Sequence, residues 1–215
     1  MFSRKRGGPK HVRPTDAPPS AALERSLAAD DAPPPPTHGP WDAEYAPEGV
    51  ERLDLGSLQI PAIEGVEVRV QANPDGGVEQ IVLVDGDSAL QLGVFAAPKS
   101  EGIWDEVRAE IAESMNAQRK GSATEKDGPF GAELHGSLPG EGGRGTVPVR
   151  FVGVDGPRWF LRGLLAGPAA ADPAKAAIFE DALRNVVVVR GAEPLPVREP
   201  VPLQLPADIP VPGTE

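Results

Sequence analysis

The distribution of proline limits where a folded domain can lie in this chain of 215 residues. Of 26 prolines, ten fall in residues 1–48 and seven in residues 190–215, which leaves nine for the long centre. Proline lacks a backbone donor, and polar proline-rich segments bury too little apolar surface to offset the entropy of ordering. The sequence therefore predicts one domain over residues 49–190, a disordered tail over 1–48, and a separate C-terminal segment over 191–215.

The two end segments differ in character. The N-terminal tail is basic over residues 1–13, is acidic beyond them, and carries a proline run at Pro33–Pro36 that favours polyproline II. Within this tail, Trp41 and Tyr45 are expected to dock on the domain. The C-terminal segment keeps many aliphatic side chains between Pro194 and Pro212. It is either an extended strap packed across the domain or a free proline-rich ligand for a partner.

Short apolar segments with a period of two predict strands within the domain. Val66, Val68 and Val70 alternate with charged residues. A second strand is expected over Val78–Val84, and its Ile81–Val84 run is apolar on both faces, as in a central strand. The Asp-Gly pairs at 85–86 and 155–156 indicate hairpins. Further strands are expected over residues 90–94, 130–137, 146–155, 158–166 and 186–189.

Two helices are expected between these strands. The first has Ser100 as its N-cap, and a second begins with Asp172 as N-cap and Pro173 at its first position. The apolar stripe of the first helix comprises Ile103, Trp104, Val107, Ile111 and Met115. The fold class is therefore α+β, a mainly antiparallel sheet of six or seven strands with two helices packed on one face.

No motif in the sequence supports a catalytic, metal or cofactor site. The GxGxxG pattern from Gly140 to Gly145 is followed by a strand, whereas a dinucleotide site needs a helix there. Glu133, His135 and Ser137 share a strand face, but their spacing of ~6.6 Å exceeds hydrogen-bonding reach. Cysteine is absent and histidine is scarce. We therefore expect no catalytic residues, no metal and no cofactor.

Basic residues gather on one predicted face of the sheet. If the helices cover the face of Trp159, Leu161 and Leu165, the opposite face is cationic and exposes an aromatic ring. The candidate ligand-binding residues on it are Arg150, Arg158, Phe160, Arg162, Arg69 and His135. Such a face suits an anionic ligand or an acidic partner segment. The alternative is a solvated face whose arginines pair with glutamates on neighbouring strands.

Charge and the N-terminal sequence bear on location and partners. The net charge of −11 disfavours general nucleic-acid binding, although residues 1–13 offer a contact for nucleic acid or anionic lipid. The basic start runs into Gly7-Gly8-Pro9 and not into an apolar stretch, so no secretory signal is expected. No apolar run reaches the ~18 residues of a membrane span. A cytoplasmic location is the expectation.

Four segments carry a resemblance to a known family: residues 39–42, 53–58, 153–163 (GVDGPRWFLRG) and 187–191. Over residues 39–206 the chain resembles the actinobacterial domain of unknown function 3710 family, which implies a cytoplasmic bacterial protein and no transferable functional residues. The order of elements is also similar to PsbP-like α/β/α domains, which are binding and assembly modules.

The function expected from these observations is a non-catalytic binding or adaptor module with a protein partner. The alternative is a small-anion or nucleotide-binding protein, or an enzyme of unrecognised type, that uses the arginine face.

Overall fold

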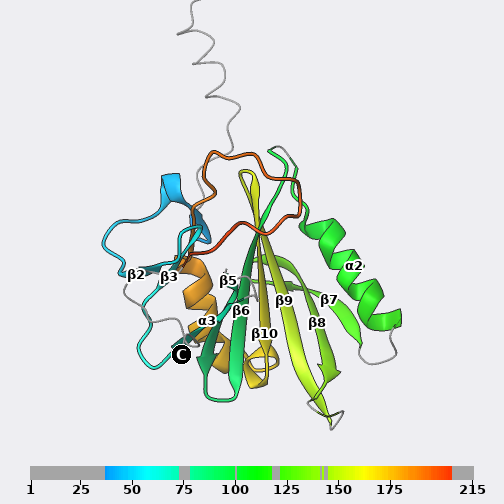
Figure 1. Cartoon of the computed structure of the whole chain (residues 1–215). Coiled ribbons are helices and arrows are strands. Elements are labelled where there is room, and N and C mark those ends of the chain that lie inside the picture. Colours follow the sequence, from blue (N-terminus) through cyan, green and yellow to red (C-terminus); the bar gives the residue numbers. More distant parts are fainter. Residues whose placement is uncertain are drawn as a thin grey trace, which may run out of the picture. The chain divides into compact units, whose positions relative to one another are not determined.

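The computed structural model describes residues 37–72, 78–99, 101–117, 122–140, 142 and 145–204. A seven-stranded antiparallel sheet is its central element (Figure 1), which confirms the α+β class and the antiparallel sheet expected from the sequence. In spatial order the strands are β4 (Glu67–Ala72), β5 (Val78–Asp85), β6 (Ser88–Ala96), β10 (Trp159–Ala166), β9 (Thr146–Gly156), β8 (Gly131–Pro139) and β7 (Ala123–Gly128).

A second, smaller sheet joins distant parts of the chain. Its strands, in spatial order, are β1 (Trp41–Asp42), β11 (Val187–Val188), β3 (Leu58–Pro61) and β2 (Arg52–Asp54). The expected strand at 186–189 therefore belongs to this sheet, and polar β7 completes the larger one. Because Trp41 pairs with Val187, ordered structure begins before the boundary expected at residue 48. The expected tail up to residue 36 lies outside the described residues.

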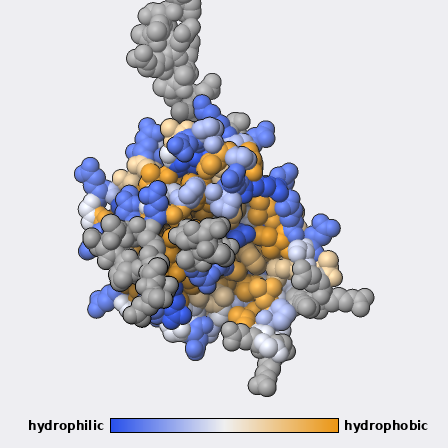
Figure 2. Space-filling model, viewed as in Figure 1, coloured by the Kyte–Doolittle hydropathy of each residue, from blue (hydrophilic) through white to orange (hydrophobic). Residues whose placement is uncertain are grey.

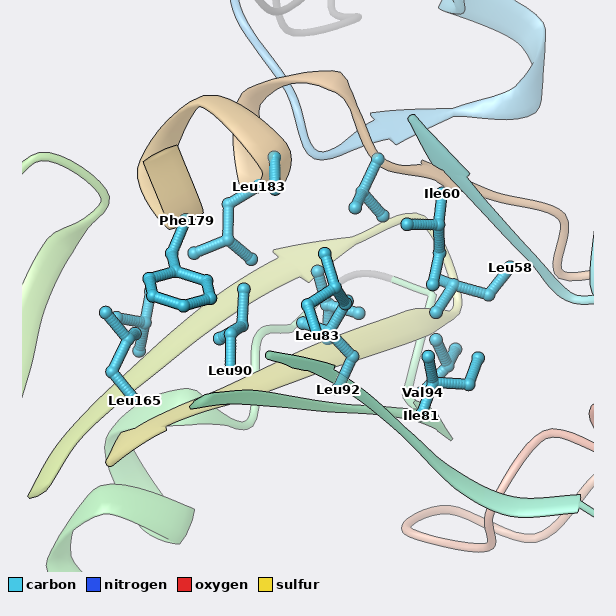
Figure 3. Packing of buried hydrophobic residues seen from close by; sticks show 14 of the residues in the cluster. Leu58, Ile60, Ile81, Leu83, Leu90, Leu92, Val94, Leu165, Phe179 and Leu183 are labelled. Atoms are coloured by element: carbon cyan, nitrogen blue, oxygen red, sulfur yellow. The ribbon is translucent and has the colours of Figure 1, made fainter. Parts of the chain in front are cut away.

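The two helices, α2 (Trp104–Ala117) and α3 (Pro173–Asn185), lie on opposite faces of the larger sheet. Leu161 and Leu165 of β10 pack in one cluster with Phe179 and Leu183 of α3 (Figure 3). The alternate residue Phe160 packs in the other cluster, with Trp104 and Met115 of α2. This is the α/β/α arrangement, so the placement of both helices on one face was wrong. Strand β10 is apolar on both faces because each face carries a helix.

Helices α2 and α3 differ in the residue that caps their N-termini. Helix α3 begins as expected, with the Asp172 side chain accepting the Ala174 N–H at 2.9 Å and Pro173 in the first turn. Ser100, the expected cap of the first helix, lies outside the described residues. At that end the Asp155 carboxylate of β9 accepts the N–H groups of Ile103 at 2.8 Å and Trp104 at 3.3 Å. Helix α2 is therefore fixed to the β9–β10 hairpin.

The C-terminal strap, defined here as residues 198–204, lies along β6. The Ala96 N–H donates to the Glu199 carbonyl at 2.8 Å, and the Val201 N–H donates to the Val94 carbonyl at 2.9 Å. Val201 and Leu203 are buried in the same cluster as α3. In Figure 1 the orange-red segment crosses the ends of β6 and β10. The strap is thus part of the folded domain as far as residue 204.

The expected hairpins form, with their turns one or two residues further along. Asp85 pairs with Ser88, so Gly86 and Asp87 make the first turn. Gly156 pairs with Trp159, and the second turn is Pro157-Arg158, where Arg158 has a φ of 65°. Between β8 and β9, the first and last glycines of the GxGxxG segment are joined, with the Gly140 N–H donating to the Gly145 carbonyl at 3.1 Å. None of the described helices has the length and apolar character needed to cross a membrane.

Candidate functional site

The six candidate residues do not share one surface. Arg150 and His135 point to the α3 side of the sheet, Phe160, Arg162 and Arg69 point to the α2 side, and Arg158 lies in the β9–β10 turn. The registers explain the separation, because Arg150 lies opposite Leu165 whereas Arg162 lies opposite Gly153. The single cationic face expected from the sequence was therefore wrong.

Arg150 is buried and fully engaged on the α3 side. It donates to both carboxylate oxygens of Glu133, at 2.5 and 2.9 Å, and to Oε1 of Glu180 at 2.7 Å. Burial alone would lower the pKa of the Arg150 guanidinium, but these bonds to the two glutamates raise it above its ordinary value. Its donors already have partners within the protein, so Arg150 acts as a structural ion pair between β8, β9 and α3.

His135 lies beside this ion pair. Its Nε2 is 3.3 Å from Oε2 of Glu133, and its register partner on β9 is Arg150. Burial, together with the charges of Lys126 and Arg150, lowers the pKa of His135, and the contact with Glu133 only partly opposes that shift. The ring is therefore held in its neutral form near neutral pH.

Three other candidate residues also make contacts within the protein that explain their positions. Phe160 is 2% exposed and stacks on Trp104 with 5.8 Å between ring centroids, so the exposed aromatic ring expected from the sequence was wrong. Arg158 donates to the Gly191 carbonyl at 2.7 Å. Arg69 is exposed and pairs with Glu67 of its own strand at 2.9 Å. Helix α2 explains the burial of Phe160, because it covers this part of β10.

Arg162 is the exception among the arginines. Its guanidinium lies over the Phe95 ring, 5.1 Å from the centroid, and burial lowers its pKa. No oxygen in the described part of the chain accepts a hydrogen bond from it. Every other described arginine donates to a carbonyl or carboxylate oxygen: Arg52, Arg69, Arg108, Arg150, Arg158, Arg184, Arg190 and Arg198.

Two hollows meet at Arg162, and both are lined by Arg162 and Phe95. The strap-side hollow, about 150 Å³, is also lined by Gln80, Gln91, Leu92, Gly93, Val94, Pro200, Val201 and Leu203. The helix-side hollow, about 180 Å³, is also lined by Ile103, Val107, Glu110, Phe160 and Arg198. Figure 2 shows hydrophobic surface between hydrophilic residues next to α2. The unpaired cation therefore faces open space on two sides.

Glycine on both neighbouring strands creates this space. Arg162 lies opposite Gly93 of β6 and Gly153 of β9, so neither strand places a side chain beside it. On the Gly153 side the Trp104 ring fills the room, because a Cβ there would lie 2.1 Å from it. On the Gly93 side the Phe95 ring lies 3.1 Å from where a Cβ would stand. Aromatic rings thus occupy the room left by the two glycines, and one of them, Phe95, lies against the Arg162 guanidinium beside both hollows.

Polar side chains border both hollows. On the strap side the amides form a ladder, in which Gln91 donates to Gln80 and Gln80 donates to Gln71. On the helix side Arg198 donates to Glu106 at 2.8 Å and to Glu110 at 2.9 Å, which ties the strap to α2. Of the residues that line the two hollows, sequence reasoning named only Arg162 and Phe160 as candidate binding residues. The one signal for the others was glutamine inside otherwise apolar strands.

The fold and the site together define an α/β/α domain with a polar-bordered, largely apolar pocket on the α2 side of its sheet. The chain belongs to the family described as "Protein of unknown function (DUF3710)", whose model matches residues 39–210. Among solved structures it is similar to the solution structure of cyanobacterial PsbP (CyanoP) from Synechocystis sp. PCC 6803, at 12% identity and a TM-score of 0.39. That alignment covers 66% of this chain and 94% of the other. The search of curated proteins found no match.

Proposed function

We propose that this domain is a non-catalytic binding module whose ligand presents an anionic group to Arg162. One observation carries the proposal: a half-buried guanidinium faces two hollows and has no acceptor in the described part of the chain. A desolvated charge without a partner costs stability, and a bound anion removes that cost. The Arg162 guanidinium is thus available to a ligand, whereas the Arg150 guanidinium already donates to Glu133 and Glu180.

The lining of the hollows supports binding over catalysis. It consists of amides, aliphatic and aromatic side chains, and the Arg198–Glu110 ion pair. Glutamine amides and an arginine fork give orientation and specificity to a ligand held by apolar contacts. Among the residues that the structure describes, no serine, threonine or histidine that would serve as nucleophile or base lines either hollow.

A thermal-shift experiment tests the proposal. The full chain is melted with acetate, hexanoate, citrate, inorganic phosphate and ATP, each added over a range of concentrations. A ligand at 100 times its dissociation constant stabilises by about 2.7 kcal/mol. We expect at least one anion to raise Tm in the wild type and to have no such effect in Arg162→Gln. Arg184→Gln is the matched control, because that arginine lies on α3 away from the hollows. If no anion changes Tm, the proposal fails.

The finer expectations from the sequence belong to the same proposal: a cytoplasmic, actinobacterial protein with a protein partner. The first two are what the family resemblance of residues 39–206 implies, and the partner is expected from the two proline-rich end segments. Affinity capture with the full chain and with a chain lacking residues 1–36 tests the partner. A protein retained only by the full chain supports a partner for the N-terminal segment. If neither chain retains a protein above background, the partner is ruled out at the conditions used.

A further inference from the structure

We infer, on the basis of the proposed function, that the ligand is a small monocarboxylic acid with an apolar chain. In this complex the carboxylate pairs with Arg162 and the chain occupies the helix-side hollow. The juxtaposition that carries the inference is the Arg162 cation, which has no acceptor among the described residues, in the lining of a space with Phe95, Ile103, Val107 and Phe160.

The charges around the pocket select a singly charged ligand. Arg162 offers one positive charge without a partner, while the charge of Arg198 is already matched by Glu106 and Glu110. Glu110 lines the helix-side hollow and shares Arg198 with Glu106, so this border carries one excess negative charge that repels a further anion. A phosphate dianion or a nucleotide therefore finds one free cation and two acids, whereas a carboxylate needs only one cation. This balance of charges around the pocket favours a ligand with a single negative charge.

The shape of the cation also favours a carboxylate. A guanidinium presents parallel N–H donors that match the two oxygens of a carboxylate. The Arg162 guanidinium lies over the Phe95 ring, which restricts where this fork can move. The amides of Gln80 and Gln91 lie in the adjoining strap-side hollow, so they form a polar surface next to the head group. The head of the ligand therefore meets the glutamine amides on the strap side and the Arg198–Glu110 ion pair at the border of the helix-side hollow.

The other side of Arg162 is suited to hydrocarbon. Val107 lies on α2, and Ile103 directly precedes that helix. Phe95 and Phe160 lie on the neighbouring strands β6 and β10, so apolar surface lies on both sides of the helix-side hollow. Its volume is about 180 Å³, which a short aliphatic chain fills more completely than an ion alone. Removing such a chain from water supplies affinity that an inorganic anion lacks.

A homologous series of acids measures the inference directly. Acetate, butyrate and hexanoate are titrated into the full chain by isothermal calorimetry, with inorganic phosphate and ATP in parallel. We expect affinity to rise about fourfold for each methylene that enters the hollow, which corresponds to ~0.8 kcal/mol. Hexan-1-ol, which has the chain but no charge, is expected to bind at least tenfold more weakly than hexanoate.

Variants assign the two parts of the ligand to the two parts of the site. Arg162→Gln is expected to abolish hexanoate binding, and Arg162→Lys, which keeps the charge without the fork, is expected to weaken it. Val107→Phe narrows the helix-side hollow and should weaken hexanoate far more than acetate. Arg184→Gln serves as the control with unchanged affinity. Circular dichroism of each variant establishes that it is folded.

The possible outcomes separate this inference from the proposed function. If phosphate or ATP binds more tightly than hexanoate through Arg162, the ligand class is wrong and the anion-binding module stands. If acetate and hexanoate bind with equal affinity, the inference that the ligand carries an apolar chain fails, and the proposed anion-binding function stands. Hexanoate binding that survives Arg162→Gln places the site elsewhere and overturns both proposals. Both also fail if no acid, phosphate or nucleotide binds.

Discussion

Arg150 and Arg162 are on neighbouring strands, but their surroundings give them opposite expected effects on stability. Replacing Arg150 with leucine leaves Glu133, which is 1% exposed, without its cation. Breaking a buried pair in this way costs about 3–5 kcal/mol. Arg162→Leu removes a charge that has no described partner, so the free energy of unfolding should stay unchanged or rise by ~1 kcal/mol. Urea denaturation of both variants measures the difference.

The difference in the free energy of unfolding between Arg150→Leu and Arg162→Leu distinguishes a structural arginine from a binding one. If Arg162→Leu lost as much stability as Arg150→Leu, Arg162 would be a structural residue and not a binding group. A stabilised Arg162→Leu protein that no longer binds anions is the pattern expected of a functional residue, since binding sites commonly reduce stability.

His135 gives a prediction about pH. Its pKa is lowered in the folded protein, so the unfolded chain binds its proton more readily. Stability from this group is therefore complete above its unfolded pKa of about 6.5 and is lost as pH falls through the lower, folded value. We expect Tm to fall as pH decreases from 7.5 to 5.5, and the fall should be smaller in His135→Gln. An identical slope in the variant would contradict this assignment.

At the residue scale, alternation along each strand could be predicted, but the pairing of faces between strands could not. The sequence correctly placed Phe160 and Arg162 on one side of β10, opposite Leu161. It placed Arg150 with Arg162 because it assumed that the helices cover only one face of the sheet. Since each face carries a helix, apolar residues lie on both, and the hydrophobic pattern no longer shows which side is open.

At the element scale, the contact between Gly153 and α2 can be tested with a single methyl group. A Cβ at Gly153 would lie 2.1 Å from the Trp104 ring, so Gly153→Ala must displace the first turn of α2. We expect a loss of about 1–3 kcal/mol and a shift of tryptophan fluorescence. Gly163→Ala is the matched control in the next strand, where the nearest atom is a Leu90 side-chain carbon at 3.3 Å. Equal losses in the two variants would argue against a specific role for Gly153.

Local signals predicted some elements and missed others for an identifiable reason. Helix α3 carries its own cap, Asp172, and so could be predicted from the sequence. The cap of α2 is Asp155, far away in the chain, and only the folded structure brings it there. Strand β7 is mostly exposed and polar, so it lacks the apolar alternation that reveals a half-buried strand. The pocket at Arg162 depends on β6, β10, α2 and the strap together.

At the scale of the whole molecule, the N-terminal strand is joined to the centre of the sheet. Asp42 of β1 accepts a hydrogen bond from the Trp159 indole at 2.8 Å, and Trp159 is 2% exposed. Its other carboxylate oxygen accepts the Glu44 N–H. One side chain thus holds together β1, the following turn and β10, although the sequence assigned Asp42 to a tail.

Asp42→Ala should therefore destabilise the whole domain and not only its edge. The substitution leaves the buried Trp159 N–H without its acceptor, which costs about 1–3 kcal/mol. Asp42→Asn keeps a side-chain oxygen for the indole and should lose less. Urea denaturation followed by tryptophan fluorescence and by circular dichroism measures the effect, and both probes should shift together because β1 and β10 unfold as one unit. If the alanine variant showed wild-type stability, residues 41–42 would be an accessory to the domain. A loss shared by both probes would place the N-terminal boundary of the cooperative unit before Asp42.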